Sequence, residues 1–318
     1  MSKSVPVNTS LSPLQQDIIA LLRQKKAILL VHYYQRREIQ EIADILGDSL
    51  ALCMEAARTD AEIIVFAGVH FMAESAAILC PDKTVIIPRP DAGCALADTI
   101  TPTELEEARQ NHPGATVITY VNSTAEIKGL SDLCCTSANA LDVVRSVPEG
   151  RQILMIPDGN LARYTALSTD RHIIPWRGFC PVHQNLTTEE VLRKKNDYPE
   201  ALFIAHPECS PEVLKLADFV GSTSAMLKFV RKSTANIFIV GTEVGMLVQM
   251  EKENPGKTLI PAANHLICDT MKYTTLEDIY TALRDMKNIV ILDEEKRRRA
   301  LISLQRMLAI SGMPVTQP

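Results

Sequence analysis

Three cysteines occupy equivalent places in this 318-residue chain. Cys94, Cys180 and Cys268 are separated by 86 and 88 residues, and each lies a few residues beyond a short apolar run that ends in proline. If their loops converge on one point, the three thiolates suit an iron–sulfur cluster, because soft sulfur ligands select such metals. A [4Fe–4S] cube needs four ligands, so one iron would stay open to substrate and could act as a Lewis acid.

Side chains that form hydrogen bonds recur at fixed distances before these cysteines. An apolar run ends in a ring 62, 60 and 62 residues before each cysteine, and further polar residues stand two and seventeen residues beyond the ring. These residues are His32, Tyr120 and His206 for the ring, then Tyr34, Asn122 and Glu208, then Ser49, Ser137 and Thr223. Imidazole and partly desolvated glutamate transfer protons near neutral pH. Hydroxyls at helix starts bind carboxylate or phosphate, although each could be an ordinary helix cap. The pattern predicts a small polyanionic substrate.

Less specific interpretations apply to single residues. A lone cysteine is usually a small buried hydrophobe, which is the interpretation for the remaining ones: Cys53, Cys80, Cys134, Cys135 and Cys209. A structural zinc held by the three repeat cysteines is disfavoured, because such zinc is normally four-coordinate. His183, three residues beyond Cys180, could be a fourth ligand or a catalytic group.

Three copies of one unit must position these residues. Each copy begins with a strand-like run, at residues 27–32, 115–120 and 201–206. We expect helices at 38–46, 126–132 and 211–217, second strands at 62–67, 152–156 and 236–240, and then a helix and the strand before the cysteine loop. Strands that alternate with helices form parallel sheets covered on both faces. Ligands bind beyond the carboxyl ends of such strands, where all these polar residues lie.

The predicted fold class is therefore α/β. It consists of three αβα domains of three layers, related by a pseudo-threefold axis around a central cavity, each with a short, mainly parallel sheet. The predicted division of the chain is a tail at 1–13, repeat domains at 14–97, 98–184 and 185–272, and a helical extension at 273–318, with Tyr280, Leu283 and Met286 on one face.

The composition narrows the class of protein. A net charge of -5 argues against a nucleic-acid surface. No uncharged apolar run is long enough to span a membrane, and no signal peptide is expected behind Met1. Eight cysteines without secretion indicate thiols and metal ligands rather than disulfides, which favours the cytoplasm.

Eight short motifs follow the repeat landmarks along the chain: VHYYQ at 31–35, GDS at 47–49, GVHFMAE at 68–74, YVN at 120–122, GFCPVH at 178–183, HPEC at 206–209, GTEVG at 241–245 and CDTMK at 268–272. Together they make the chain resemble quinolinate synthases, the NadA family of NAD biosynthesis. The resemblance implies three pseudo-symmetric domains around a [4Fe–4S] cluster held by three cysteines. It also implies condensation of iminoaspartate with dihydroxyacetone phosphate to give quinolinate, phosphate and water. An aspartate-oxidising enzyme is the expected source of the imine.

Carried over position by position, the resemblance implies roles for individual residues. The implied ligands are Cys94, Cys180 and Cys268. The implied substrate-binding residues are His32, Ser49, Tyr120, Asn122, Ser137, His206, Glu208 and Thr223. The implied catalytic residues are Glu208, Tyr34, His206, Tyr120 and His183.

The chain departs from the family pattern at two places. Relatives commonly carry an acidic residue where this chain has Gln184, and some carry a C-x-x-C-x-x-C run where this chain has Ala262 and His265. A disulfide switch is therefore not expected at the third cysteine. Two other functions stay open: a reductive dehydratase of the isoprenoid type, which also uses three cysteines, and an iron–sulfur sensor without turnover.

Overall fold

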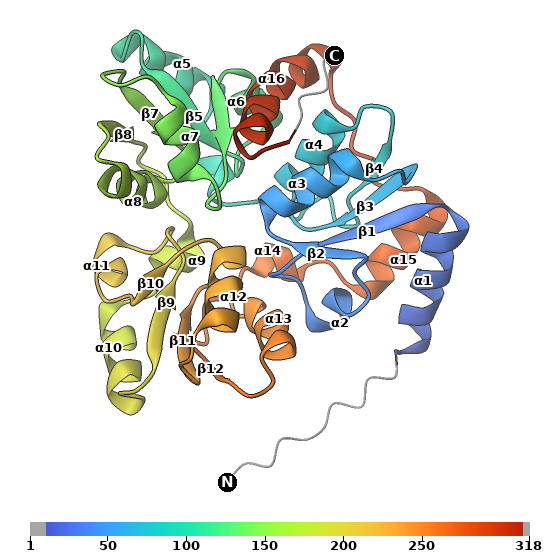
Figure 1. Cartoon of the computed structure of the whole chain (residues 1–318). Coiled ribbons are helices and arrows are strands. Elements are labelled where there is room, and N and C mark those ends of the chain that lie inside the picture. The colour runs from blue at the N-terminus through green and yellow to red at the C-terminus, as the bar shows by residue number, and fades with distance from the viewer. Residues whose placement is uncertain (1–10, 314–318) are drawn as a thin grey trace.

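The computed structural model describes residues 11–313 and contains three sheets around the centre of the molecule (Figure 1). Each sheet has four parallel strands, and the strand that comes first in the chain lies second in the sheet. The first sheet has the order β2-β1-β3-β4, with β1 (Ala27–His32), β2 (Ile45–Gly47), β3 (Ile63–Ala67) and β4 (Thr84–Ile86).

The other two sheets repeat this topology. The second has the order β6-β5-β7-β8, with β5 (Thr116–Tyr120), β6 (Leu133–Cys135), β7 (Ile153–Ile156) and β8 (Ile173–Pro175). The third has the order β10-β9-β11-β12, with β9 (Leu202–Ala205), β10 (Phe219–Val220), β11 (Ile237–Gly241) and β12 (Thr258–Pro261). We call the three sheets, with their helices, the first, second and third units.

Helices cover both faces of each sheet, which makes three layers. Neighbouring residues of a strand point to opposite faces, so Leu29 and Leu30 of β1 belong to two different apolar clusters. In each unit, one pair of helices buries apolar residues against one face of the sheet and a second pair against the other face. In the first unit the pairs are α1 (Pro13–Gln24) with α15 (Leu276–Asp285) and α3 (Ser49–Arg58) with α4 (His70–Leu79); in the second they are α5 (Pro102–Asn111) with α6 (Ala125–Gly129) and α7 (Ala140–Ser146) with α8 (Gly159–Thr169). In the third they are α10 (Thr188–Asp197) with α11 (Pro211–Leu214) and α12 (Thr223–Lys232) with α13 (Met246–Glu253). The predicted α/β architecture is confirmed.

One aspartate in each unit ties the first strand to the edge strand. Asp44, Asp132 and Asp218 accept a hydrogen bond through Oδ2 from a backbone N–H of the first strand, at 2.8, 2.8 and 2.7 Å. The N–H of each aspartate donates in return to the carbonyl of the same strand residue, at 3.1, 3.0 and 2.8 Å. These paired contacts satisfy backbone groups of the first strand of each unit.

This contact explains why the C-terminal ends predicted for the helices at 38–46, 126–132 and 211–217 are wrong. They end earlier, as α2 (Arg37–Gln40), α6 and α11, because the aspartate that follows must turn back to the first strand. Ile39, Ile42 and Leu46 imitate helical spacing, but Leu46 lies in β2.

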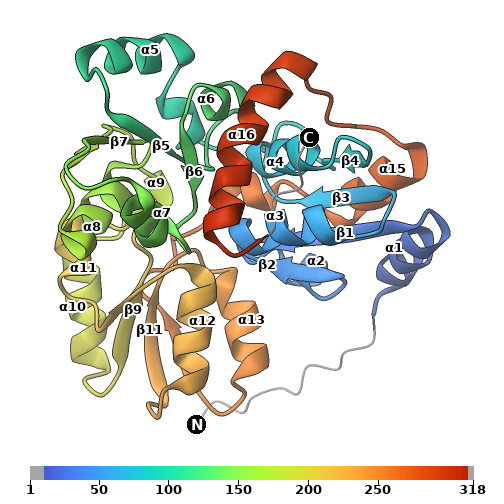
Figure 2. The same ribbon diagram turned by 45° about the horizontal axis from the view of Figure 1, so that its top comes forward.

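The C-terminal residues form two helices, of which the second joins two units. α15 packs against α1 and β3 of the first unit, with Leu283 fully buried and Tyr280 and Met286 partly buried beside it; Met286 lies just beyond the end of the helix. α16 (Glu294–Ile310) packs against α6 and β6 of the second unit and α4 of the first (Figure 2). The first and second units are therefore bridged by a helix that comes from neither sheet.

Two further sequence expectations concern the ends and the surface of the chain. Residues 1–10 of the predicted tail lie outside the described residues, and Ser12 caps α1, which begins at Pro13. Among the described residues, no helix combines the length and the hydrophobicity that crossing a membrane requires.

Candidate active site

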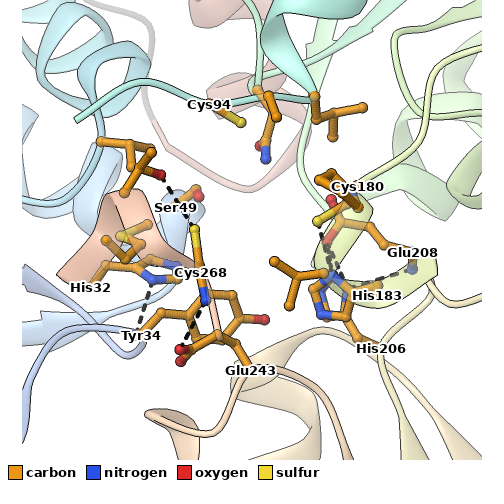
Figure 3. A pocket seen from close by; sticks show the side chains of 18 of the residues that line it. His32, Tyr34, Ser49, Cys94, Cys180, His183, His206, Glu208, Glu243 and Cys268 are labelled. Carbon is orange, nitrogen blue, oxygen red and sulfur yellow. Dashed lines mark hydrogen bonds and ion pairs between the residues drawn. The ribbon is translucent and has the colours of Figure 1, made fainter. Parts of the chain in front are cut away.

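A cavity of about 390 Å³ lies where the strand ends of the three units meet. Every residue that the sequence analysis named as a candidate lines it: His32, Tyr34, Ser49, Cys94, Tyr120, Asn122, Ser137, Cys180, His183, His206, Glu208, Thr223 and Cys268. The repeat therefore brings together side chains that are far apart in the chain, and Figure 3 labels ten of the lining residues around the space.

The three cysteines reach the cavity from three separate loops (Figure 3). Cys180 and Cys268 directly precede the short helices α9 (Pro181–Gln184) and α14 (Asp269–Lys272), and Cys94 precedes the turn at Ala97–Thr99. All three are free thiols that are only partly exposed. Burial raises the pKa of the Cys94 thiol to about 12 and also raises the pKa of Cys180 and Cys268, so a metal ion must displace their protons on binding.

Carboxylates hold two of the three cysteine loops. The backbone N–H of Cys180 donates to Asp158 Oδ2 at 3.2 Å, and that of Cys268 donates to Glu243 Oε1 at 3.3 Å. Both carboxylates stand two residues beyond the third strand of their unit, β7 or β11, where the first unit has the apolar Val69 after β3. Burial raises the pKa of both carboxyl groups.

The Cys180 loop also depends on a close approach at Gly178. A Cβ there would lie 2.2 Å from Thr99 Oγ1 and 2.5 Å from the carbonyl oxygen of Pro157. We expect Gly178→Ala to lower the free energy of unfolding by about 1–3 kcal/mol, because the backbone must shift. Thermal denaturation measures this, with Gly93→Ala beside Cys94 as the control, since a Cβ at Gly93 meets nothing within 4 Å. Equal melting temperatures for both variants would contradict the expectation.

Glu208 is the centre of a buried polar chain. Its Oε2 lies 2.9 Å from His183 Nδ1 and 3.1 Å from His206 Nδ1. His183 Nε2 lies 2.9 Å from Thr242 Oγ1, which in turn lies 2.6 Å from the Tyr34 hydroxyl. Glu208, His183, Thr242 and Tyr34 thus form a continuous route along which protons can move.

Burial sets the charge states of these groups. It lowers the pKa of His32 to about 3 and also lowers the pKa of His206, while it raises the pKa of the Tyr34 and Tyr120 hydroxyls. Burial acts to raise the pKa of the Glu208 carboxyl as well, but the imidazoles beside it outweigh this effect and hold that pKa below its ordinary range. Glu208 is therefore an anion, and the two tyrosines keep their protons at neutral pH.

Two of the three hydroxyls expected at helix starts, those of Ser49 and Thr223, are available to a ligand. Ser49 and Thr223 are the first residues of α3 and α12, but the side chains that cap these helices belong to the preceding residues, Asp48 and Ser222. The expectation of a helix start was wrong for Ser137, which lies in the turn before α7. Its hydroxyl lies 3.2 Å from His206 Nε2.

Sequence reasoning named neither Thr242 nor Asn160 as a site residue. Thr242 lies one residue beyond β11 and joins His183 to Tyr34. Asn160 Nδ2 donates to Gln184 Oε1 at 2.7 Å and to the carbonyl oxygen of Glu208 at 3.0 Å. Gln184 therefore supports the backbone of Glu208, and an amide oxygen is sufficient for that contact.

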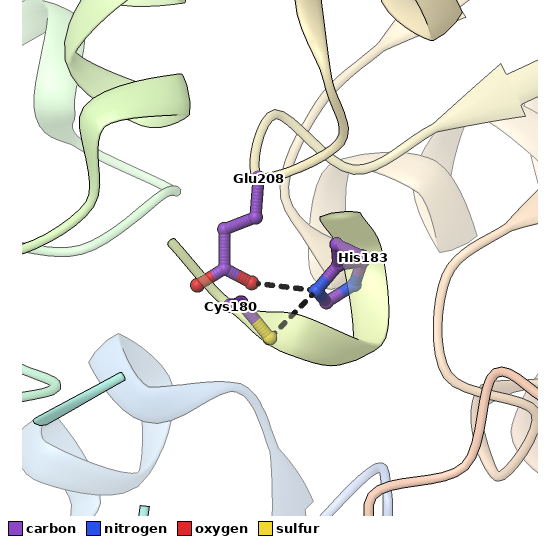
Figure 4. A group of neighbouring side chains, drawn as sticks. All are labelled: Cys180, His183 and Glu208. Atoms are coloured by element: carbon purple, nitrogen blue, oxygen red, sulfur yellow. Dashed lines mark hydrogen bonds and ion pairs between the residues drawn. The ribbon is translucent and has the colours of Figure 1, made fainter. Parts of the chain in front are cut away.

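The donor set fits a bound metal group in two ways. Three thiols from three units line one cavity, as a cluster with three protein ligands requires. Cys180, His183 and Glu208 also offer ligand atoms within 4.8 Å of one another (Figure 4). Among the described side chains, Glu208 Oε1 and Asn122 Oδ1 are buried in the cavity without a hydrogen-bond partner, which is expected where a ligand completes the site.

Comparison with known proteins agrees with this geometry. The family model described as quinolinate synthetase A protein matches residues 16–309. The chain is 54% identical to the quinolinate synthase of Geotalea uraniireducens (strain Rf4), over 93% of this chain and 97% of the relative. It is 53% identical to that of Pelobacter propionicus, over 93% and 98%, and 47% identical to that of Methanosarcina barkeri, also over 93% and 98%. The chain is an enzyme that belongs to the quinolinate synthase (NadA) family.

Proposed function

We propose that this enzyme condenses iminoaspartate with dihydroxyacetone phosphate to give quinolinate, phosphate and water, a step of NAD biosynthesis. The observation that carries the proposal is the single cavity in which three thiols from three units face a buried Glu208–His183–Thr242–Tyr34 chain. Family membership supports the reaction, and the cavity supports the roles of the residues.

The metal group that we propose is a [4Fe–4S] cluster held by Cys94, Cys180 and Cys268. Thiolate donors favour iron–sulfur clusters over hard cations, and the three ligands come from equivalent loops. When bound, such a cluster would supply one open iron that polarises a substrate hydroxyl or carboxylate. His183 is then a catalytic group rather than a fourth ligand, because its two nitrogens already contact Glu208 and Thr242.

The remaining wall of the cavity suits two small acids. Ser49, Ser137 and Thr223 present one hydroxyl from each unit. Ser49 and Thr223 stand in the first turn of a helix, where backbone N–H groups and the helix dipole favour carboxylate and phosphate. Neutral His32 binds a substrate oxygen as a hydrogen-bond partner. Tyr120 and Asn122 orient the intermediate from the second unit.

Proton transfer falls to the chain of residues around Glu208. Carbon–carbon bond formation takes a proton from carbon, and isomerisation of the triose moves protons between its carbons and oxygens. Closure on nitrogen takes protons from nitrogen and delivers a proton to a departing hydroxyl, which leaves as water. The Glu208 carboxylate with His183 and His206 accepts protons, and the Tyr34 hydroxyl, joined through Thr242, returns them.

The cellular setting follows from the substrates. Iminoaspartate hydrolyses in water, so an aspartate-oxidising enzyme is the proposed source. All eight cysteines are free thiols, which suits the reducing cytoplasm.

The test is direct synthesis of quinolinate. The chain is loaded with iron and sulfide under anaerobic conditions and incubated with dihydroxyacetone phosphate and freshly generated iminoaspartate. We expect quinolinate and one equivalent of phosphate, both of which need the two substrates together. A reductive dehydratase would instead need an electron donor, and a sensor would turn over neither substrate. Absence of quinolinate from cluster-loaded protein would contradict the proposal.

A further inference from the structure

A buried ion pair next to the third cysteine joins two units of the fold. Lys272, the last residue of α14, pairs with Glu243 at 2.9 Å. The side chain of Glu243 is fully buried, and that of Lys272 is 21% exposed. Removing two charges from water costs free energy, so we ask what the contacts of each partner do for the active site.

Each partner reaches a different part of the active site. Glu243 Oε1 accepts from the N–H of Cys268, and its Oε2 accepts from the N–H of Gly245 at 2.7 Å. The ammonium of Lys272 donates to the backbone carbonyl of Tyr34, which belongs to the first unit. One ion pair thus contacts both the loop of a proposed metal ligand and the loop of a proposed catalytic tyrosine; Figure 3 shows Glu243 beside Cys268 and Tyr34.

The surrounding backbone is shaped to this pair. A Cβ at Gly245 would lie 2.7 Å from Glu243 Oε2, 2.8 Å from Lys272 Nζ and 3.0 Å from the carbonyl carbon of Tyr34. Only glycine lets the third unit approach the Tyr34 loop this closely. Gln40 Nε2 closes the same junction by donating to the carbonyl of Gly245 at 3.0 Å and to that of Tyr33 at 2.8 Å.

The junction is connected to the proposed catalytic side chains through Thr242, which precedes Glu243 in the chain and contacts both Tyr34 and His183. The Tyr34 hydroxyl meets Thr242 Oγ1 at 2.6 Å, so Tyr34 contacts the third unit at both ends, by its hydroxyl and by its carbonyl. We propose that Lys272, paired with Glu243, is a positioning residue that holds the Tyr34 hydroxyl against Thr242 and fixes the Cys268 loop relative to it. This rests on the proposed function for its effect on turnover, and on geometry alone for its effect on the loop.

The experiment compares cluster-loaded Lys272→Met with the parent enzyme by two measurements. Amide hydrogen exchange is expected to become faster at residues 33–36 and around Cys268, with the rest of the chain unchanged. Turnover is expected to fall about 10- to 100-fold, as for residues that orient metal-site groups, mostly in kcat with little change in KM. The matched control is Lys26→Met, which breaks an exposed pair with Glu62 at the other end of β1 and β3 and should change neither measurement.

A second variant separates positioning from stability. Lys272→Met combined with Glu243→Gln removes both buried charges, so it avoids the cost of an unpaired carboxylate and should unfold near the parental temperature. We expect the Tyr34 loop to stay loosened and turnover to stay low in this double variant. Recovery of loop protection and activity together with stability would overturn the proposal, as would faster exchange spread evenly over the chain. If the parent makes no quinolinate, the proposed reaction fails, and the exchange measurement still decides the role of Lys272.

Discussion

Replacing Glu208 with glutamine is expected to lower kcat about 100- to 10,000-fold, the range that general acid–base groups contribute. The amide keeps the size of the side chain but not the negative charge that contacts His183 and His206 at 2.9 and 3.1 Å. Without that carboxylate, the two imidazoles lose the charged partner that orients them. Steady-state quinolinate formation measures the loss.

The metal content of the same variant is an equally informative result. If three cysteines hold a cluster, Glu208→Gln keeps its iron, sulfide and visible absorption. Glu212→Gln, an exposed change four residues further along the chain, is the matched control and should leave both activity and metal unaltered. Turnover within about twofold of the parent would remove Glu208 from the proton-transfer chain.

Single serine variants of Cys94, Cys180 and Cys268 are expected to abolish activity and to lose the cluster. The hydroxyl of serine stays protonated near neutral pH, and its oxygen is a harder donor than a thiolate sulfur. Each unit supplies only one of the three sulfurs, so no neighbouring thiol replaces a lost one. Anaerobic reconstitution followed by iron and sulfide analysis, with absorption spectra, measures the loss. Cys209→Ser is the control, because this buried thiol lies outside the cavity lining.

The three variants also separate a cluster from a single metal ion. An ion held by Cys180, His183 and Glu208, which lie within 4.8 Å of one another, would be lost on changing Cys180 and retained on changing Cys94 or Cys268. It would also be lost from Glu208→Gln. Equal loss of metal from all three cysteine variants, with retention in Glu208→Gln, is the pattern that only three-thiol ligation predicts.

Much of the fold and of the candidate site can be predicted because the sequence repeats. Strand β1 has the bounds expected from its apolar run, Ala27–His32, and the landmarks that follow each first strand all reach one cavity. Residues equivalent in sequence occupy equivalent places around a threefold arrangement. The spacing of the repeat therefore predicts that Cys94 and Cys268 lie close together, whereas local sequence patterns predict only secondary structure.

The shorter strands and helices could not be predicted from the local pattern of apolar residues. A three-residue edge strand such as Ile45–Gly47 is too short to show alternation, and helical spacing upstream obscured it. The aspartates that pair with the first strand were nevertheless within reach, because Asp44, Asp132 and Asp218 each stand twelve residues beyond the ring of their unit. An aspartate at the same position in all three copies indicates where each helix ends, whereas the residues of one copy alone do not.

Thr242 was missed for a different reason. A threonine just after a strand is common, and nothing in its neighbourhood indicates that His183, 59 residues earlier, and Tyr34, 208 residues earlier, will meet its hydroxyl. Such a contact exists only after the units have docked. The same holds for Lys272, whose partner in the first unit lies 238 residues away.

The supply of one thiol by each unit also determines when a metal group can be inserted. A growing polypeptide carries the complete set of sulfurs only after Cys268 has left the ribosome, and they meet only once all three sheets have come together. One face of each sheet packs on an apolar cluster of its own unit, while a larger cluster is shared by all three units, so apolar burial holds the fold together, in contrast to a zinc finger. If the three thiols hold a cluster, as we propose, iron and sulfide must therefore be delivered after the three units have come together and not earlier.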